Sequence, residues 1–295
     1  HLVYDKAILK SMTSFAGWNF LGNGAYMLNT QGVNILMNMY FGVAVNAARG
    51  VATQVDAALK QFVNSFTTAV NPQITKSYAQ GDLKSMHKLV CRSAKFSAFL
   101  MMFFAVPIIL ETDQILTLWL KNPPAYASIF LKWIIISSFM DTVLANSLVT
   151  SMFATGNIKR YQIIVTTVGC LVFPLSWLAF QLGFEPQVGY ILYFIIYSIL
   201  LIIRLYLLRG MVKLPIMMYV REVLLRLLPT IAICFASSSL FLIVIEEGFI
   251  RLVLITLLNL IITSITVYFI GLERSEKTYF KTLLSKLPIL KRNLI

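Results

Sequence analysis

The chain has 295 residues, of which 58% are hydrophobic and only 13% are charged, and its net charge is +13. Its mean hydropathy is +0.79, whereas about a quarter of the residues in a soluble domain are charged. The composition therefore excludes a soluble globular protein and predicts an all-α, polytopic bundle of membrane-spanning helices.

Apolar stretches long enough to cross a hydrocarbon core of about 30 Å recur along the chain. We expect eight spans, at residues 11–40, 43–70, 94–118, 126–153, 161–182, 187–208, 227–245 and 249–271. Two further segments, 82–93 and 213–227, alternate basic and apolar residues at helical spacing. We expect both to lie in the plane of the membrane interface, with His87 solvated on the first of them.

Basic residues gather on one side of this predicted topology. Alternating the loops between two faces places 20 of the 25 Lys and Arg on one face, and omitting either of the first two spans destroys this sorting. By the positive-inside rule, we expect that face and both ends of the chain to be cytoplasmic. Attraction to anionic lipid head groups explains basic residues beside the membrane, so we expect no nucleic-acid partner. The opening residues lack a signal-peptide pattern, so the first span is expected to direct insertion.

Residue types that carry enzyme chemistry are sparse. Cys91, Cys170 and Cys234 are scattered singly, and His1 and His87 lack the spacing of metal ligands. The sequence contains neither a phosphate-binding glycine loop with its lysine nor a nucleophile elbow. We therefore expect no catalytic residue, no metal and no cofactor, and a chain that moves a molecule and does not convert it.

A polar stripe runs along the second predicted span. At 100° per residue, its members fall within about 60° of one line on the helix. They are Asn46, Arg49, Thr53, Asp56, Lys60, Asn64, Thr67 and Asn71. Charges at membrane depth cost several kcal/mol unless they face protein or water, so we expect this stripe to line an open groove or cavity. The i, i+4 spacing of Asp56 and Lys60 predicts an ion pair along the helix.

Two other spans add polar residues to the same region. One face of the first span carries Asn19, Asn23, Tyr26, Thr30 and Asn34. A tight turn near residues 41–42 would place this face beside the stripe, and the fourth span would add Asp141. Three structural alternatives stay open: Arg49 reaching the membrane surface, Asp56 and Lys60 only holding helices together, and Asp141 serving only as an interhelical hydrogen-bonding group.

The chain resembles a known protein family over essentially its whole length. The segment NMYFGVAVNAARGVATQVDAALKQFVNSFTTAVNPQITKSYAQGD, residues 38–82, looks like the start of the second lobe of Wzx-like polysaccharide biosynthesis proteins. These are the O-antigen and lipid-linked oligosaccharide flippases of the multidrug/oligosaccharidyl-lipid/polysaccharide exporter superfamily. ILTLWLKNPPAY, residues 115–126, resembles the outer-loop continuation of that family, and ATGNIKRYQ, residues 154–162, its next cytoplasmic turn.

The resemblance implies an all-helical, MATE-like fold of two six-helix lobes around a central cavity, often with two further helices. Residues 1–210 would be the second lobe, and residues 211–295 an amphipathic segment, the extra helix pair and a basic cytoplasmic tail. Because eight spans are fewer than such proteins have, we expect a carboxy-terminal portion whose missing amino-terminal lobe would supply the other cavity wall. A truncated chain is favoured over a natural eight-helix flippase.

The function implied is translocation of an undecaprenyl-diphosphate-linked oligosaccharide by alternating access, for O-antigen, capsule or exopolysaccharide synthesis. Arg49 and Lys60 would attract the diphosphate, and Asp56 would hold Lys60 when the site is empty. Tyr26 and the asparagines of the first span would meet sugar hydroxyls. The implied partners are membrane lipid, the lipid-linked oligosaccharide, a polysaccharide polymerase and glycosyltransferases. Two alternatives are a multidrug or organic-cation antiporter of the same superfamily and a non-transporting membrane scaffold.

We expect the final predicted pair, 227–245 and 249–271, to have small hydroxyls and one amide as its only intramembrane polar groups. Either these helices simply thicken the bundle, or they form a lipid-facing wall along which a polyprenyl tail lies. The second role requires a hydrophobic groove between this pair and the preceding helices, connected to the polar stripe from the side.

Overall fold

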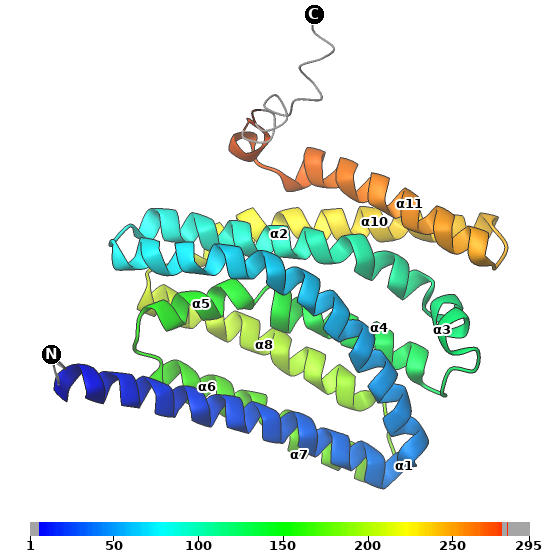
Figure 1. Ribbon diagram of the computed structural model, residues 1–295, viewed down its shortest axis with the longest axis horizontal. Coiled ribbons are helices and arrows are strands. Elements are labelled where there is room, and N and C mark those ends of the chain that lie inside the picture. Colours follow the sequence, from blue (N-terminus) through cyan, green and yellow to red (C-terminus); the bar gives the residue numbers. More distant parts are fainter. Residues whose placement is uncertain (1–5, 279–281, 283–295) are drawn as a thin grey trace, which may run out of the picture.

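The computed structural model describes residues 6–278 and 282, and every regular element in this part of the chain is a helix (Figure 1). Six segments are long and apolar enough to cross a membrane: Leu83–Leu110, Ala127–Ala154, Lys159–Gln181, Val188–Met211, Ile216–Val244 and Phe249–Gly271. The chain is therefore a polytopic helical bundle of the kind found in multi-pass membrane proteins. These six segments correspond to the last six predicted spans.

The helical elements, in chain order, are α1 (Lys6–Ala79), α2 (Leu83–Leu110), α3 (Thr112–Leu120), α4 (Ala127–Ser138), η1 (Phe139–Val143), α5 (Asn146–Ala154), α6 (Lys159–Gly169), α7 (Val172–Gln181), α8 (Val188–Met211), α9 (Ile216–Tyr219), η2 (Val220–Leu224), α10 (Leu225–Val244), α11 (Phe249–Thr266) and η3 (Val267–Gly271). Each of the three η elements is a single π-helical turn that continues the α-helix before it.

The first two predicted spans are two parts of α1, which is less apolar than the six segments above and is 74 residues long. The chain reverses direction at Gly42, whose φ of 81° and ψ of −178° belong to a region open almost exclusively to glycine. This confirms the turn expected at residues 41–42. We call residues 6–41 the first arm and residues 43–79 the second arm (Figure 1).

The first arm packs against α6 and α7, which together make one interrupted span. Asn29 on this arm bridges the interruption, because its Nδ2 donates to Gly169 O at 3.2 Å and its Oδ1 accepts from Phe173 N at 3.0 Å. Backbone groups freed by a broken helix need protein partners at membrane depth, and the buried Asn29 amide supplies them. A Cβ on Gly32 would lie 2.6 Å from the Phe173 ring, so this contact requires a glycine.

The second arm packs against α2, α4 and α5. The Phe62 and Phe104 rings meet edge to face, with centroids 5.0 Å apart, and Asn146 Nδ2 donates to Thr67 Oγ1 at 3.4 Å. The second arm thus has an apolar side toward α2 and a polar side toward α4 and α5.

Residues 82–93 do not form the separate interfacial helix expected from the sequence. α2 begins at Leu83 and runs unbroken to Leu110, with Asp82 as its N-cap, accepting from Ser85 N at 3.0 Å. Hydrogen bonds from Ser85 lower the pKa of the Asp82 carboxyl. His87 is buried, and its Nε2 lies 2.8 Å from Val212 O, so the expected solvated position of His87 is wrong. The apolar residues of this segment pack against protein, which produces the same sequence pattern as packing against lipid.

Residues 213–227 also differ from the expected interfacial segment, because α9, η2 and α10 continue as one span from Ile216 to Val244. Tyr219 in this segment is fully buried, and its hydroxyl donates to Leu144 O at 2.9 Å. The segment is therefore the first part of the span and is anchored in the bundle.

Two buried ion pairs attach the final helices to the rest of the bundle. Arg251 in α11 makes a bidentate contact with Glu111, with Nε–Oε1 at 2.7 Å and Nη2–Oε2 at 3.0 Å. Lys95 Nζ in α2 lies 2.7 Å from Glu276 Oε2, just after η3. Together they hold both ends of the helix formed by α11 and η3. Most of the predicted basic tail lies outside the described residues.

Candidate functional site

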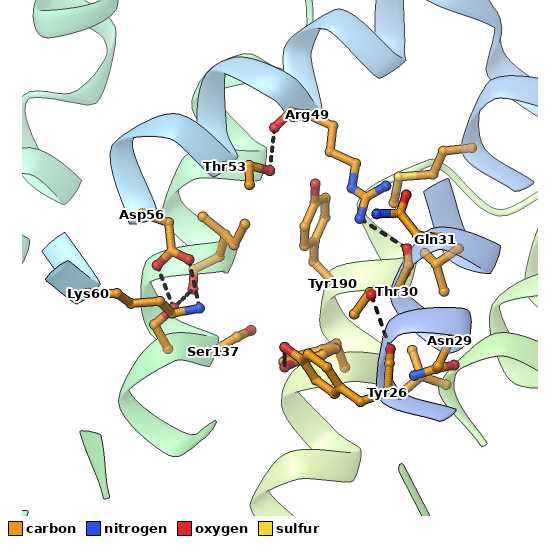
Figure 2. Close-up of a pocket in the computed structure, with 17 residues that line it drawn as sticks. Tyr26, Asn29, Thr30, Gln31, Arg49, Thr53, Asp56, Lys60, Ser137 and Tyr190 are labelled. Atoms are coloured by element: carbon orange, nitrogen blue, oxygen red, sulfur yellow. Dashed lines mark hydrogen bonds and ion pairs between the residues drawn. The ribbon is translucent and has the colours of Figure 1, made fainter. Parts of the chain in front are cut away.

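A central cavity of about 300 Å³ lies between the two arms of α1 and helices α4, α7 and α8 (Figure 2). Its polar lining consists of Tyr26, Asn29, Thr30, Gln31, Arg49, Thr53, Asp56, Lys60, Ser137, Ser138, Tyr190 and Tyr193. Neutral hydroxyl and amide groups make up most of this lining, and three charged side chains stand among them.

The ion pair expected between Asp56 and Lys60 is present, with Lys60 Nζ 2.8 Å from Asp56 Oδ2. Asp56 also accepts a hydrogen bond from the Ser138 hydroxyl of α4. The carboxylate is buried, whereas the Lys60 side chain keeps partial access to the outside. Asp56 thus holds the second arm to α4 and orients Lys60 along the cavity wall.

Arg49 joins the two arms on another side of the cavity, where its Nη2 donates to Thr30 O at 3.2 Å. Figure 2 shows its guanidinium and the Asp56–Lys60 pair lying apart, with the Tyr190 ring between them. The bond to Thr30 uses one of the five guanidinium N–H donors, and Arg49 also interacts with the Tyr190 hydroxyl. The two cations therefore reach the cavity from different directions.

The central cavity is open to the exterior. Gln31 and Thr53 are exposed, and Arg49 and Lys60 are half-buried. The stripe is thus not covered by apolar side chains of the later helices, as an open groove requires. The one buried charge of the stripe, Asp56, faces a hydroxyl and an ammonium group.

A second cavity of about 190 Å³ adjoins the first, and Tyr26 and Asn29 line both. We call it the Arg204 cavity, and its polar lining includes Asn23, Tyr26, Asn29, Asp141, Tyr161, Gln162, Thr166, Tyr197 and Arg204. It lies between the first arm and helices α5, α6 and α8.

Asp141 enters the Arg204 cavity from η1, the π-helical turn between α4 and α5. Such single turns are frequent at functional sites because they change the direction of a side chain within a helix. Asp141 Oδ2 accepts from Tyr193 OH at 2.8 Å, and Tyr193 OH lies 3.5 Å from Tyr26 OH. Tyr193 also stacks on Tyr197, with ring centroids 4.0 Å apart. A chain of phenols therefore connects Asp141 to the boundary between the two cavities.

The structure brings together most of the predicted site residues. Arg49, Thr53, Asp56 and Lys60 line the central cavity, Asn23 and Asp141 line the Arg204 cavity, and Tyr26 lines both. Four predicted residues, Asn19, Asn34, Asn46 and Asn64, line neither. Asn19 accepts from Asn23, and Asn34 donates to Gln31, so these two amides bond along their own helix.

Several cavity residues were not predicted from the sequence. Asn29, Gln31, Ser137, Ser138, Tyr190 and Tyr193 line the central cavity, and Tyr161, Gln162, Tyr197 and Arg204 line the second. Ser137 and Ser138 lie in the segment of the fourth span that also carries Asp141, and this proximity was a usable signal. The tyrosines gave none, because an aromatic residue in an apolar span fits a lipid-facing position equally well.

The two cavities together are lined by more positively charged side chains than negatively charged ones. Arg49, Lys60 and Arg204 carry positive charge, against Asp56 and Asp141. Within the described residues, no group of three or more His, Cys, Asp or Glu side chains is placed to hold a metal ion. The arrangement suits an anionic molecule with many hydroxyl groups better than a cation.

A separate apolar groove of about 760 Å³ lies between the helix formed by α11 and η3, the second arm and α2. Phe66, Phe96, Phe103, Val267, Tyr268 and Leu272 line it, with Arg92 and Glu276 among its polar residues. This is the location at which a tail-binding groove was expected. The groove and the central cavity have no lining residue in common, so the expected side connection stays a prediction.

Comparison of the chain with known protein families, with curated proteins and with solved structures finds no match.

Proposed function

We propose that this protein translocates a lipid-linked oligosaccharide across a bacterial inner membrane by alternating access. The observation that carries the proposal is the central cavity, in which Arg49 and Lys60 face an open, hydroxyl-rich space inside a bundle of membrane spans. Alternating access lets a polar head group cross without entering hydrocarbon, and it needs such a site among the helices.

The diphosphate of the carrier would bind at Arg49 and Lys60. Arg offers a planar fork of donors that matches phosphate oxygens, and Lys offers a mobile point charge. Because Asp56 already holds Lys60 at 2.8 Å, an arriving diphosphate would compete with Asp56 for the ammonium group. The site would thus keep its charge compensated both with and without substrate.

The sugars would occupy the neutral part of the cavity. Sugar hydroxyls need partners that both donate and accept, which the Ser137, Tyr190 and Gln31 side chains provide. A cavity of about 300 Å³ holds a small part of an oligosaccharide, so the open side would admit the remainder. A second helical lobe would face this open side. Glycosyltransferases would build the glycan before it is flipped, and a polysaccharide polymerase would use it afterwards.

A flipping assay tests the proposal. Protein reconstituted in liposomes should move a fluorescent undecaprenyl-diphosphate oligosaccharide between leaflets, and Arg49→Ala and Lys60→Ala should each slow this movement about tenfold or more, as expected for lost charge-assisted contacts. Lys132→Ala is the matched control, because Lys132 pairs with Asp113 outside the cavity at 3.5 Å. Unchanged flipping in both cavity variants would remove these residues from the substrate role.

The second candidate is an organic-cation antiporter, and the charge balance weighs against it. A site for cations favours excess carboxylates, but Arg49, Lys60 and Arg204 outnumber Asp56 and Asp141 here. Transport of a quaternary ammonium dye by the reconstituted chain, with none of the lipid-linked sugar, would favour this alternative. A scaffold without a substrate path would transport neither compound.

A further inference from the structure

Arg204 is a buried cation that the proposed mechanism does not use. It lies on α8, three positions after the apolar residue Leu201, and is only 5% exposed. Its neighbours along the helix, Tyr206 and Arg209, are both exposed. The position of Arg204 in the sequence is typical of a basic residue that flanks a span, but its side chain points into the protein.

No carboxylate forms an ion pair with this guanidinium within the part of the chain that the structure describes. Its Nε and Nη1 atoms are buried and have no hydrogen-bond partner there. Asp141 lines the same cavity, but its Oδ2 is engaged by Tyr193 at 2.8 Å. The neighbouring Tyr161 hydroxyl interacts with Arg204 but is neutral. The guanidinium therefore keeps free N–H donors, and Asp141, the carboxylate of the same cavity, bonds to Tyr193.

The cavity beside Arg204 has room for a ligand group. Its volume of about 190 Å³ equals that of about six water molecules at roughly 30 Å³ each. Gln162, Tyr197 and Asn23 add neutral polar groups around the guanidinium. This composition, a buried guanidinium with unpaired N–H donors at Nε and Nη1 among amides and phenols, suits one oxyanion group.

We infer that the Arg204 cavity is an oxyanion subsite that binds one carboxylate or phosphate group through the Arg204 guanidinium. Tyr26 and Asn29 line both cavities, so a molecule in the central cavity can extend an acidic group into this subsite. The inference deepens the proposed function and rests on it for the identity of the molecule that carries the oxyanion. It selects substrates whose head group has a second acidic group, such as a uronic acid, beyond the site of Arg49 and Lys60.

Binding is testable without transport. The full chain in lipid nanodiscs is heated with glucuronate, inorganic phosphate or neutral glucose, at constant ionic strength maintained with chloride. We expect glucuronate or phosphate to raise the melting temperature and glucose to leave it unchanged. A response to glucuronate alone assigns the subsite to an acidic sugar, and a response to phosphate alone assigns it to a phosphate group.

Two substitutions on the same helix separate the subsite from general charge effects. Arg204→Gln should weaken binding about tenfold or more, because it removes charge-assisted bonds that are about twice as strong as neutral ones. Arg204→Lys should weaken it less, since it keeps the charge and loses the planar arrangement of the guanidinium donors. Arg209→Gln is the matched control, because it removes the same charge from an exposed position of α8, and it should bind as the unmodified chain does.

A third variant keeps the test decisive if Arg204→Gln does not fold. Val165→Phe narrows the Arg204 cavity and leaves Arg204 in place. It should therefore also abolish the rise in melting temperature caused by the oxyanion. The inference is overturned if neither oxyanion raises the melting temperature, which leaves a cavity filled by water, or if the shift persists in Arg204→Gln or Val165→Phe. Failure of the flipping assay with the Arg204-dependent shift intact would instead overturn only the proposed function.

Discussion

Lys60 Nζ lies 2.8 Å from Asp56 Oδ2, and the two side chains of this pair differ sharply in exposure, at 28% for Lys60 and 5% for Asp56. Their separate removal should therefore have unequal costs. Lys60→Met leaves a buried carboxylate without its cation, which costs about 3–5 kcal/mol in comparable buried pairs. Asp56→Asn leaves an ammonium group that can turn to water, so we expect about 1 kcal/mol, as for exposed pairs.

Unfolding free energies from titration with denaturing detergent measure both variants. The double variant Asp56→Asn with Lys60→Met should recover part of the loss caused by Lys60→Met alone, because no unpaired charge remains. Equal losses for the two single variants would show that Asp56 is not buried as a carboxylate.

Breaking the buried ion pair of Arg251 with Glu111 should cost more stability than breaking the exposed pair of Lys132 with Asp113. Glu111 is almost fully buried, so Arg251→Met should destabilise the protein by about 3–5 kcal/mol. Lys132→Met breaks the exposed pair with Asp113 and should cost about 0–1 kcal/mol. The same detergent titration compares them, and a cost for Arg251→Met no greater than that for Lys132→Met would mean that this ion pair does not attach α11.

Gly42 should resist substitution for a reason that involves only its backbone. A Cβ at this position meets nothing within 4 Å, but the φ of 81° is unfavourable for alanine, so Gly42→Ala should cost about 1–3 kcal/mol. Gly50→Ala is the control in the same helix, where a Cβ also meets nothing within 4 Å, and it should be stabilising by up to about 1 kcal/mol. Distances between spin labels at the exposed positions Leu28 and Ala58 report the angle between the arms. An unchanged distance and stability in Gly42→Ala would contradict the account of the bend.

Water should reach the central cavity but not the helix face beside it. Thr53 is exposed and lines the cavity, whereas Ala52 is fully buried. In a Cys170→Ala background, where Cys91 and Cys234 are buried, a membrane-impermeant thiol reagent should label Thr53→Cys and leave Ala52→Cys unreacted. Failure to label Thr53→Cys would favour a dry scaffold over a transport path.

Sequence reasoning succeeded where the relevant geometry lies within one helix. The spacing of Asp56 and Lys60 and the turn at Gly42 depend on the backbone alone, and both predictions were confirmed. Four predicted amides, Asn19, Asn34, Asn46 and Asn64, share the polar faces of their helices but line neither cavity. Helical periodicity gives the direction of a side chain, but it does not give the depth at which another helix covers it.

The failures have a common physical cause, which is that protein and lipid interfaces select similar residues. The segments 82–93 and 213–227 have the pattern of interfacial helices, but protein covers their apolar sides. Arg204 resembles a flanking basic residue, and its burial follows from the way α6 and the first arm pack over α8. Asn29 is a cavity residue because α6 and α7 break beside it, and the sequence of the first span has no signal of that break.

The proposed function requires the substrate to occupy the space between Arg49 and Lys60, and crosslinking at Tyr190 measures this occupancy. A photoreactive benzoylphenylalanine replaces either Tyr190, which is 8% exposed and lines the central cavity, or Tyr206, which is 68% exposed on the same helix. The account predicts that a labelled undecaprenyl-diphosphate oligosaccharide crosslinks at position 190, that excess unlabelled substrate prevents this, and that position 206 gives only a background that excess substrate does not change. Equal crosslinking at the two positions, or crosslinking at position 206 alone, would contradict this occupancy.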